Sequence, residues 1–490
     1  MSGRFKKIIK KIKNLNLIVE KYKQETVIQS LPSVAQVNRA KRMINDGRPE
    51  EAKEVLLEAL ELPNKDPLVY KYLGLVYDIL HDYPNAAEAY RNSAGLNPQD
   101  KIIWQKLGFA LIAVGRYADA EKSFENAQKV MPGSTDTFTG WGMALMKADK
   151  LQEAAEKFAQ ASTANKYNFM AIFLAAVTSV KLGEYDKADA KLAFLANVCP
   201  NETNAYEYAN LKYLRGDLNN AIFYAEKSLE YNPGMLPAYV LLGKLYTHKC
   251  DREQALRYFE TAYEKDLINT NLYLEWACAF IKFGMYGQAK EKLSAALALE
   301  PDNADLKANL ALCYALAGNI EDAQNCIKDI TANPVCSVVS GIIAYENAEY
   351  EKAVDFLKKT LDDEADNFVS HYYLAKSYRK LNNRAKTQEH FDAALDENPE
   401  YLQARLDYAE YFISEGDYAE ARRKLRKALK SEPDNPELLN LLFFAGYMLV
   451  KENSCGYNIK EVLAAAAKIP PEFFRYSKQK EELEEILGKI

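Results

Sequence analysis

Histidine is scarce in this sequence, and the histidines that occur are far apart. Four are present in 490 residues, at His81, His248, His371 and His390, and no two have the spacing of a metal-binding HExxH motif. The HKC run at residues 248–250 is more typical of a turn than of a metal site. We therefore expect no metal centre and no cofactor.

The motifs that carry enzyme chemistry are missing as well. There is no GxxxxGK[ST] phosphate loop, and the GWGMAL run at residues 140–145 lacks the third glycine of a dinucleotide fingerprint. Carboxylate pairs such as Glu153 and Glu156 fall where a helix exterior is expected, and there a solvated face is the usual role. The sequence predicts no catalytic residue, and we expect that the chain is not an enzyme.

Cysteine pairs, long apolar runs and a strong net charge are also absent. The seven cysteines never form a CxxC pair, which favours a reducing compartment. No run of about 18 apolar residues occurs, and a net charge of -6 provides no overall attraction to nucleic acid. We expect a cytoplasmic protein that binds no nucleic acid and is at most peripheral at the inner face of a membrane.

What is present is a repeat of 34 residues. In the stretch from Lys101 to Pro132, large residues, small residues and the glycine and proline that end helices stand at fixed intervals. They are Trp104, Leu107, Gly108, Leu111, Gly115, Ala120, Phe124, Ala127 and Pro132. The same residue types return 34 positions later, at Phe138, Trp141, Gly142, Leu145, Ala154, Phe158 and Ala161, and 34 positions earlier, at Tyr70, Leu73, Gly74, Tyr77, Ala86, Tyr90 and Pro98.

This pattern resembles the tetratricopeptide repeat family, in which a large residue, an LG or LA pair, an aromatic residue, alanines and a proline recur at this period. Tracked along the chain, units begin near residues 33, 67, 101, 135, 169, 202, 236, 270, 304, 334, 368 and 402, with a degenerate unit near 436. The resemblance implies an all-α solenoid, a right-handed superhelix of about 12 helix-turn-helix repeats.

Each position also has a physical reason. Apolar residues at positions 4, 7 and 11 of a unit form a stripe on a first helix, and those at positions 20, 24 and 27 form a stripe on a second helix. Small residues at positions 8 and 20 let the two helices approach, so we expect Gly108 opposite Ala120 and Gly142 opposite Ala154. The spacing falls to 30 between residues 304 and 334, which predicts a kink or, less favoured, a hinge.

A binding groove is expected on the inward positions of the first helices. In the third to fifth units these positions are mostly apolar, which suits an amphipathic helix or an extended apolar segment of a partner. The alternative is that the side chains pack on the adjacent repeat. The candidates are Ile102, Phe109, Ile112, Met143, Met146, Phe173, Leu174, Val177 and Val180, with Val240 and Leu241 further along.

A second candidate site combines basic and aromatic residues at the inward positions of the unit that begins at residue 368. A patch of this kind suits an acidic peptide, and the alternative is an ordinary solvated face. The residues are Tyr372, Tyr373, Lys376, Arg379 and Lys380.

The N-terminal segment, residues 1–32, is basic and amphipathic. Between Arg4 and Lys23 it has eight basic residues against one acidic residue. This composition fits a helix on an anionic membrane, and the alternatives are packing on the first repeat or a solvated tail. The candidate membrane contacts are Phe5, Lys6, Lys7, Ile8, Lys10, Lys11 and Ile12.

Three parts are therefore expected: the N-terminal segment, an array over residues 33–435, and a degenerate repeat with capping helices over residues 436–490. We expect a non-enzymatic scaffold or adaptor that binds a protein or peptide in its concave groove. Two alternatives are a peripheral membrane-associated assembly factor recruited by the N-terminal helix, and a regulatory subunit of a separate enzyme.

Overall fold

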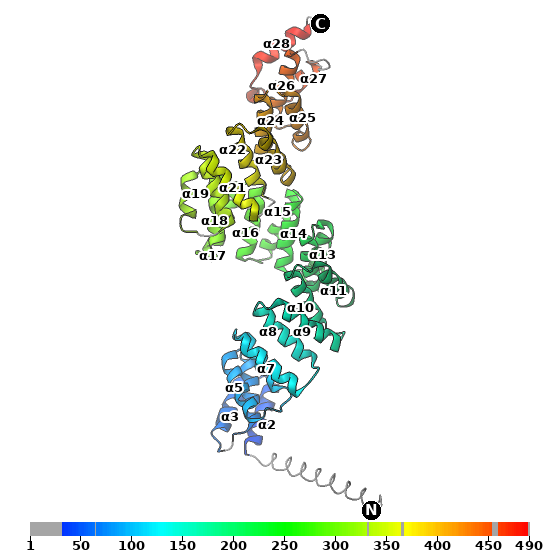
Figure 1. Ribbon diagram of the computed structural model, residues 1–490, viewed down its shortest axis with the longest axis vertical. Helices are drawn as coiled ribbons and strands as arrows, with labels where there is room; N and C mark the ends of the chain where they lie inside the picture. The colour runs from blue at the N-terminus through cyan, green and yellow to red at the C-terminus, as the bar shows by residue number, and fades with distance from the viewer. Residues whose placement is uncertain (1–31, 64, 331–332, 364–366, 453–458, 489–490) are drawn as a thin grey trace, which may run out of the picture. The chain divides into compact units, whose positions relative to one another are not determined.

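A computed structural model describes residues 32–63, 65–330, 333–363, 367–452 and 459–488 (Figure 1). These residues form 27 α-helices and one short 3-10 helix, and the described ranges contain no strand. The helices belong to two compact units that meet in sequence at Asp217 and Leu218. The predicted all-α class, built from successive helix pairs, is confirmed.

In the first unit, first helices carry even numbers and second helices odd numbers, and each helix packs on its neighbours along the chain. The first helices begin at or within two residues of the predicted starts. The helices are α2 (Pro32–Asn45), α3 (Pro49–Leu60), α4 (Pro67–Ile79), α5 (Tyr83–Leu96), α6 (Ile103–Ala113), α7 (Tyr117–Val130), α8 (Thr135–Lys147), α9 (Leu151–Ala164), α10 (Phe169–Lys181), α11 (Tyr185–Val198) and α12 (Glu202–Leu214).

The second unit continues the same alternation and ends in shorter helices. Its elements are α13 (Leu218–Tyr231), α14 (Leu236–His248), α15 (Arg252–Glu264), α16 (Thr270–Lys282), α17 (Tyr286–Leu299), α18 (Ala304–Leu316), α19 (Ile320–Ile327), α20 (Pro334–Glu346), α21 (Tyr350–Asp363), α22 (Phe368–Lys380), α23 (Arg384–Glu397), α24 (Leu402–Ser414), α25 (Tyr418–Ala428), α26 (Pro436–Lys451), α27 (Ile459–Ala467), η1 (Pro471–Phe473) and α28 (Ser477–Gly488).

The change of spacing after residue 304 is explained by one short helix. Helix α19 has 8 residues, whereas α17 and α21 on either side each have 14. The turn of helix that the sequence lacks is therefore missing from the second helix of this repeat. Helix α20 packs on α18 as well as on α19, as successive first helices also do elsewhere in the array.

The glycines at position 8 make room for an aromatic ring of the paired helix. A Cβ atom on Gly108 would lie 2.6 Å from the Phe124 ring, and one on Gly142 would lie 2.6 Å from the Phe158 ring. The expected neighbours, Ala120 and Ala154, are fully buried, but the closest contact is the ring four residues further along the second helix. The nearest neighbour of each glycine is therefore the aromatic ring of the second helix, which reaches across the helix crossing.

The proline that ends one repeat is tied to the next repeat by a hydrogen bond. The indole Nε1 of Trp104 donates to the carbonyl oxygen of Pro98 over 2.9 Å, and the Tyr239 hydroxyl donates to that of Pro233 over 3.2 Å. In both pairs the donor follows the proline by six residues. The large residue at position 4 is thus both a packing residue and a hydrogen-bond donor.

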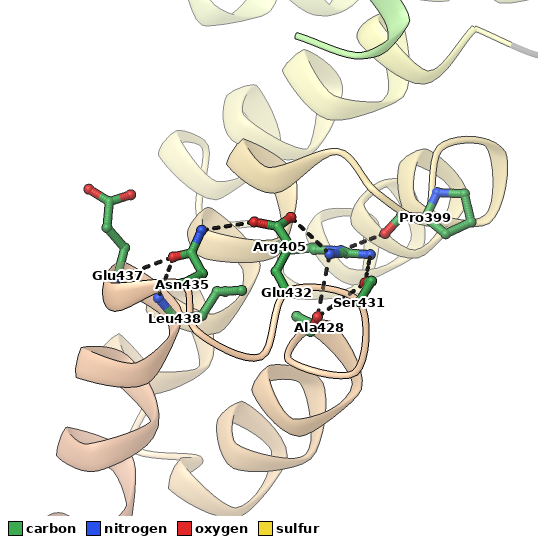
Figure 2. A network of polar contacts seen from close by, with 8 residues as sticks. All are labelled: Pro399, Arg405, Ala428, Ser431, Glu432, Asn435, Glu437 and Leu438. Atoms are coloured by element: carbon green, nitrogen blue, oxygen red, sulfur yellow. Dashed lines mark hydrogen bonds and ion pairs between the residues drawn. The ribbon is translucent and has the colours of Figure 1, made fainter. Parts of the chain in front are cut away.

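Arg405 takes the same place in the twelfth repeat. Its Nε donates to the Pro399 carbonyl, and its Nη2 donates to Ser431 Oγ over 2.9 Å. Its Nη1 lies 3.5 Å from the Ala428 carbonyl and 3.4 Å from a carboxylate oxygen of Glu432. Figure 2 shows the guanidinium between these groups. A single side chain therefore joins the end of α23, the start of α24 and the end of α25.

Beyond α25, Glu432 extends this network to the first helix of the C-terminal region. The Asn435 amide donates to Glu432 Oε2 over 2.9 Å, and the Asn435 side-chain oxygen accepts from the backbone amides of Glu437 and Leu438 (Figure 2). Asn435 is the N-cap of α26, so the network fixes where this helix begins.

None of the described helices is both long enough and apolar enough to cross a bilayer.

One contact in the second unit joins repeats that are three apart. The side-chain amide of Asn398, at the end of α23, donates to the carbonyl oxygen of Lys282, at the end of α16, over 2.8 Å. The side chains of Tyr286 and Tyr401 also lie close to each other. In a regular array each repeat contacts only its neighbours, so these contacts close one turn of this unit on itself.

Candidate binding groove

The first helices α6, α8 and α10 lie side by side in the first unit, since α6 contacts α8 and α8 contacts α10. The predicted groove residues lie on these helices or, in the case of Ile102, at the N-cap of α6. Ile102 and Phe109 are 48% and 38% exposed. Ile112, Met143, Met146, Phe173, Val177 and Val180 are half-buried, and Leu174 is buried. All but one of these side chains therefore present some apolar surface to solvent.

Several of these side chains also pack on the adjacent repeat. The Phe109 ring meets that of Phe124 edge-on at 5.3 Å, and its tip would lie 2.8 Å from a Cβ on Gly140 of α8. Thr178 of α10 donates a hydrogen bond to the Met146 sulfur over 3.5 Å. The groove is thus continuous with the core and is held in shape by it, which limits the entropy lost when a partner binds.

A hollow lies at the N-terminal ends of α10 and α12. This hollow has a volume of about 470 Å³, and Phe169, Met170 and Phe173 line one side of it. Met170 is 60% exposed, and the neighbouring Tyr167 is 62% exposed. Apolar side chains with this exposure, grouped on one surface, are typical of a site that binds another protein.

In the second unit, residues at the corresponding inward positions are covered. Val240 and Leu241 on α14 are each 6% exposed, and Tyr372 and Tyr373 on α22 are 2% and 6% exposed. The Tyr401 ring, which belongs to the closing contact, lies edge-on to Tyr372 at 5.1 Å. Tyr372 is therefore covered in part by Tyr401 of the adjacent repeat.

The residues of the predicted acidic-peptide patch differ in burial: some belong to the interior and others face solvent. The Lys376 ammonium lies 4.6 Å from the centre of the Tyr345 ring and is half-buried, and burial lowers its pKa against the opposing effect of Asp407. The Tyr372 hydroxyl donates to Asp407 over 2.5 Å. Tyr372 and Lys376 thus belong to an internal network. Two cations of the patch remain nearer to solvent: half-buried Arg379 and exposed Lys380.

Sequence reasoning missed a pair of histidines. His371 on α22 and His390 on α23 face each other with their Nδ1 atoms 3.0 Å apart, and His371 Nε2 lies 3.4 Å from a carboxylate oxygen of Glu397. Burial first, and His371 second, lower the pKa of His390 to about 4.

The described residues contain no group of three or more ligands that could hold a metal ion. The HKC run is a turn, as predicted, because Lys249 and Cys250 follow the end of α14.

A pocket of about 500 Å³ in the second unit was also not predicted from the sequence. It lies among the first helices α14, α16, α18, α20 and α22, and its polar lining includes Lys244, Glu275, Lys282 and Asn309. Lys244 and Glu275 form an ion pair with a distance of 3.1 Å. These residues occupy inward positions of successive repeats, so the spacing could have identified them.

The N-terminal segment with Phe5 to Ile12 lies outside the described residues.

Comparison with known proteins identifies the family. The family model described as tetratricopeptide repeat matches residues 280–334 and 383–442. This chain therefore contains tetratricopeptide repeats. Its fold is similar to that in the crystal structure of the APC/C hetero-tetramer Cut9-Hcn1, with a TM-score of 0.53 and 12% sequence identity. That likeness covers 94% of this chain and 98% of the other, and at this identity it concerns the fold alone.

The curated relatives match this chain over only part of their length. The chain is 22% identical over 256 residues to the TPR repeat-containing protein YpiA of Bacillus subtilis (strain 168), a match that covers 52% of this chain and 53% of that protein. It is 23% identical over 206 residues to the human Protein O-mannosyl-transferase TMTC1, over 40% of this chain and 23% of that protein. The tetratricopeptide repeat chain thus spans about half of the first relative and about a quarter of the second.

Proposed function

We propose that this tetratricopeptide repeat protein is a non-enzymatic scaffold that binds an apolar segment of a partner protein along α6, α8 and α10. The observation that carries the proposal is the exposure of Ile102 and Phe109 at inward positions of their repeat and of Met170, which lines the hollow at the start of α10. Exposing apolar surface is unfavourable by about 25 cal/mol for each Å², so a partner that covers these side chains gains this free energy.

The residue types favour a segment that is amphipathic rather than purely charged. The half-buried methionines Met143 and Met146 are flexible enough to fit side chains of different shape. Lysines lie on the same helices at Lys106, Lys147 and Lys181. An amphipathic helix with an apolar face and acidic flanks would therefore fit this surface best.

The test compares two triple variants of the full chain. In the groove variant, Ile102, Phe109 and Met170 are each changed to serine. In the control variant, serine replaces three leucines of similar exposure on second helices, Leu57, Leu96 and Leu299. Partners are captured from native lysate with the unmodified chain, and the affinity of each purified partner is then measured by fluorescence anisotropy.

We expect the groove variant to bind a direct partner at least about tenfold more weakly, because exposed apolar anchors carry much of the energy of such interfaces. The control variant should bind with unchanged affinity. Equal affinities for all three proteins would contradict the proposed site. Circular dichroism at the start establishes that both variants keep the helical content of the unmodified chain.

The membrane-associated and enzyme-regulating alternatives remain separate predictions. The first depends on residues 1–32 and predicts that deletion of residues 1–23 abolishes sedimentation with vesicles of phosphatidylserine and phosphatidylcholine. The second predicts that a catalytic partner co-purifies with the chain. Either property is compatible with the groove, because neither uses α6, α8 or α10.

A further inference from the structure

Two lysines flank the apolar groove at the same place in successive repeats. Lys147 is the last residue of α8 and Lys181 is the last residue of α10, and both side chains are exposed. They are 34 residues apart, which is one repeat. The residue before each lysine, Met146 or Val180, is a half-buried residue of the groove. The groove therefore has a cationic edge at the C-terminal ends of these two helices.

The two turns that carry the lysines lie against each other. Thr178 of α10 donates a hydrogen bond to the Met146 sulfur of α8 over 3.5 Å. Met146 directly precedes Lys147. Thr178 lies about one helical turn before Lys181. The axes of packed helices are about 8–10 Å apart, so we expect the two lysines, at equivalent positions, to be separated by about this distance.

The charges of these lysines are not used inside the described part of the chain. Neither Lys147 nor Lys181 forms an ion pair with a described residue. At the opposite end of α8, the first turn carries the exposed acidic residue Asp136. The two edges of the groove thus differ in the sign of their charge, which gives a bound segment a preferred side for its acidic residues.

The separation of the lysines distinguishes a helical partner from an extended one. In an α-helix, residues seven positions apart lie on nearly the same face and about 10.5 Å apart. In an extended strand, side chains on one side follow each other at about 6.6 Å, and the next on that side lies at about 13 Å. A separation of about 8–10 Å is therefore matched better by a helix than by a strand.

We propose that Lys147 and Lys181 set the register of a partner helix that crosses α8 and α10, by pairing with two acidic residues seven positions apart in that helix. Its apolar face covers Met143 and Val177, and the side nearest Asp136 carries no acidic residue. This inference rests on the proposed function, because it specifies the chemistry of the segment that the same groove binds.

The probes are three synthetic fluorescent peptides of about 20 residues, long enough to form a helix. All share one leucine-rich face. The first has two glutamates seven positions apart beside that face, the second has the same composition with the glutamates five positions apart on different sides, and the third has lysines in place of the glutamates of the first. Fluorescence anisotropy measures the affinity of each peptide for the full chain at low and at physiological salt.

Three variants of the full chain are compared with the unmodified chain. In the reversed variant, Lys147 and Lys181 are both changed to glutamate, and in the neutral variant both are changed to glutamine. The control variant carries Lys380→Glu and Lys427→Glu, which reverse two exposed lysines in the last turns of α22 and α25. Circular dichroism establishes that each variant keeps the helical content of the unmodified chain.

We expect the unmodified chain to bind the first peptide about tenfold more tightly than the second at low salt, because two exposed ion pairs form with one spacing only. Physiological salt should reduce this difference. The reversed variant should prefer the lysine peptide, the neutral variant should have no preference between the two glutamate peptides, and the control variant should behave as the unmodified chain does.

Several results would overturn the register. They are equal affinities of the unmodified chain for the two glutamate peptides, an unchanged preference in the reversed variant, an equal change in the control variant, and no binding of any peptide. The groove itself is judged separately. If the first peptide binds and the serine variant of Ile102, Phe109 and Met170 weakens it, the groove proposal stands even where the lysines have no effect; if that variant binds it with unchanged affinity, the groove proposal fails.

Discussion

The indole of Trp104 donates a hydrogen bond to the carbonyl oxygen of Pro98, so the residue that opens one repeat is bonded to the residue that ends the one before. Tyr239 and Arg405 make the same bond to Pro233 and Pro399. In each case the proline's own carbonyl oxygen lies beyond the end of the helix, and a side chain of the next repeat donates to it.

Arg405 should be the most sensitive of these donors. Its side chain is 9% exposed, and burial lowers its pKa while Glu432 opposes that shift. We expect Arg405→Ala to lower the free energy of unfolding by about 1–3 kcal/mol, because the Pro399 carbonyl and Ser431 Oγ lose the hydrogen bonds that this side chain donates and the Glu432 carboxylate loses its ion-pair partner. Arg405→Lys should cost about half as much, since an ammonium keeps the charge but cannot reach all the acceptors of the guanidinium. Urea unfolding of the two variants measures this order, and a reversed order would contradict it.

Close packing at a helix crossing gives a second prediction. Gly108→Ala places a methyl group 2.6 Å from the Phe124 ring, so we expect a loss of about 1–3 kcal/mol in stability. The matched control is Gly95→Ala on α5, where nothing lies within 4 Å of the new Cβ. A gain of about 0.5–1 kcal/mol is expected there, because alanine favours the helix. Thermal unfolding of both variants distinguishes the two environments, and similar effects would be evidence against the crossing contact.

Turns that lack glycine offer a route to stabilisation. Ala348, between α20 and α21, has φ of 59°, whereas glycine occupies the equivalent turn positions Gly318 and Gly416. We expect Ala348→Gly to stabilise the chain by about 1 kcal/mol, since glycine has no Cβ to clash in this conformation. Ala159→Gly, at an exposed position inside α9, should instead destabilise by about 1 kcal/mol. Chemical denaturation tests both signs, and a loss at residue 348 would refute the argument.

The histidine pair predicts a dependence of stability on pH. The pKa of His390 is about 4 in the folded chain and near 6.5 when unfolded, so between these values the unfolded state binds more protons. Stability should therefore fall as pH drops through this window, by at most about 1.4 kcal/mol per pH unit, and should not depend on His390 above pH 7. His390→Gln should reduce the fall, as measured by urea midpoints at pH 7.5 and 5.0. Groups that titrate equally in both proteins cancel in this comparison, and identical pH profiles would show that His390 has no such effect.

Helix positions were predictable from the sequence because the signals that define them are local and repeated. The starts of α4, α8, α10, α14 and α18 follow directly from the recurrence of large, small and breaker residues, and the loss of a turn near residue 320 is visible as a change of spacing. Such patterns record which side chains must fit between adjacent helices. They hold for any array with this repeat, whatever its curvature.

Contacts between distant repeats were not predictable in this way. The repeat position of Tyr372 predicts an inward-facing, accessible side chain, but it is 2% exposed and packs against Tyr401 of the next repeat. The pairing of His371 with His390 likewise depends on the side-chain directions of two helices rather than on a motif. The exposure of Ile102 and Phe109 depends only on the immediate neighbours of α6, so it follows from the local repeat pattern.

The bond between Asn398 and Lys282 also changes how the second unit can unfold. In the first unit the helices pack on near neighbours along the chain. Its repeats can therefore unfold one at a time from the end. In the second unit the same bond spans 116 residues, so a partial opening within that span must first give up contacts at both ends of it. Residues 282–398 should therefore behave as one cooperative block, with uniform hydrogen-exchange protection rather than a gradient that falls from one repeat to the next.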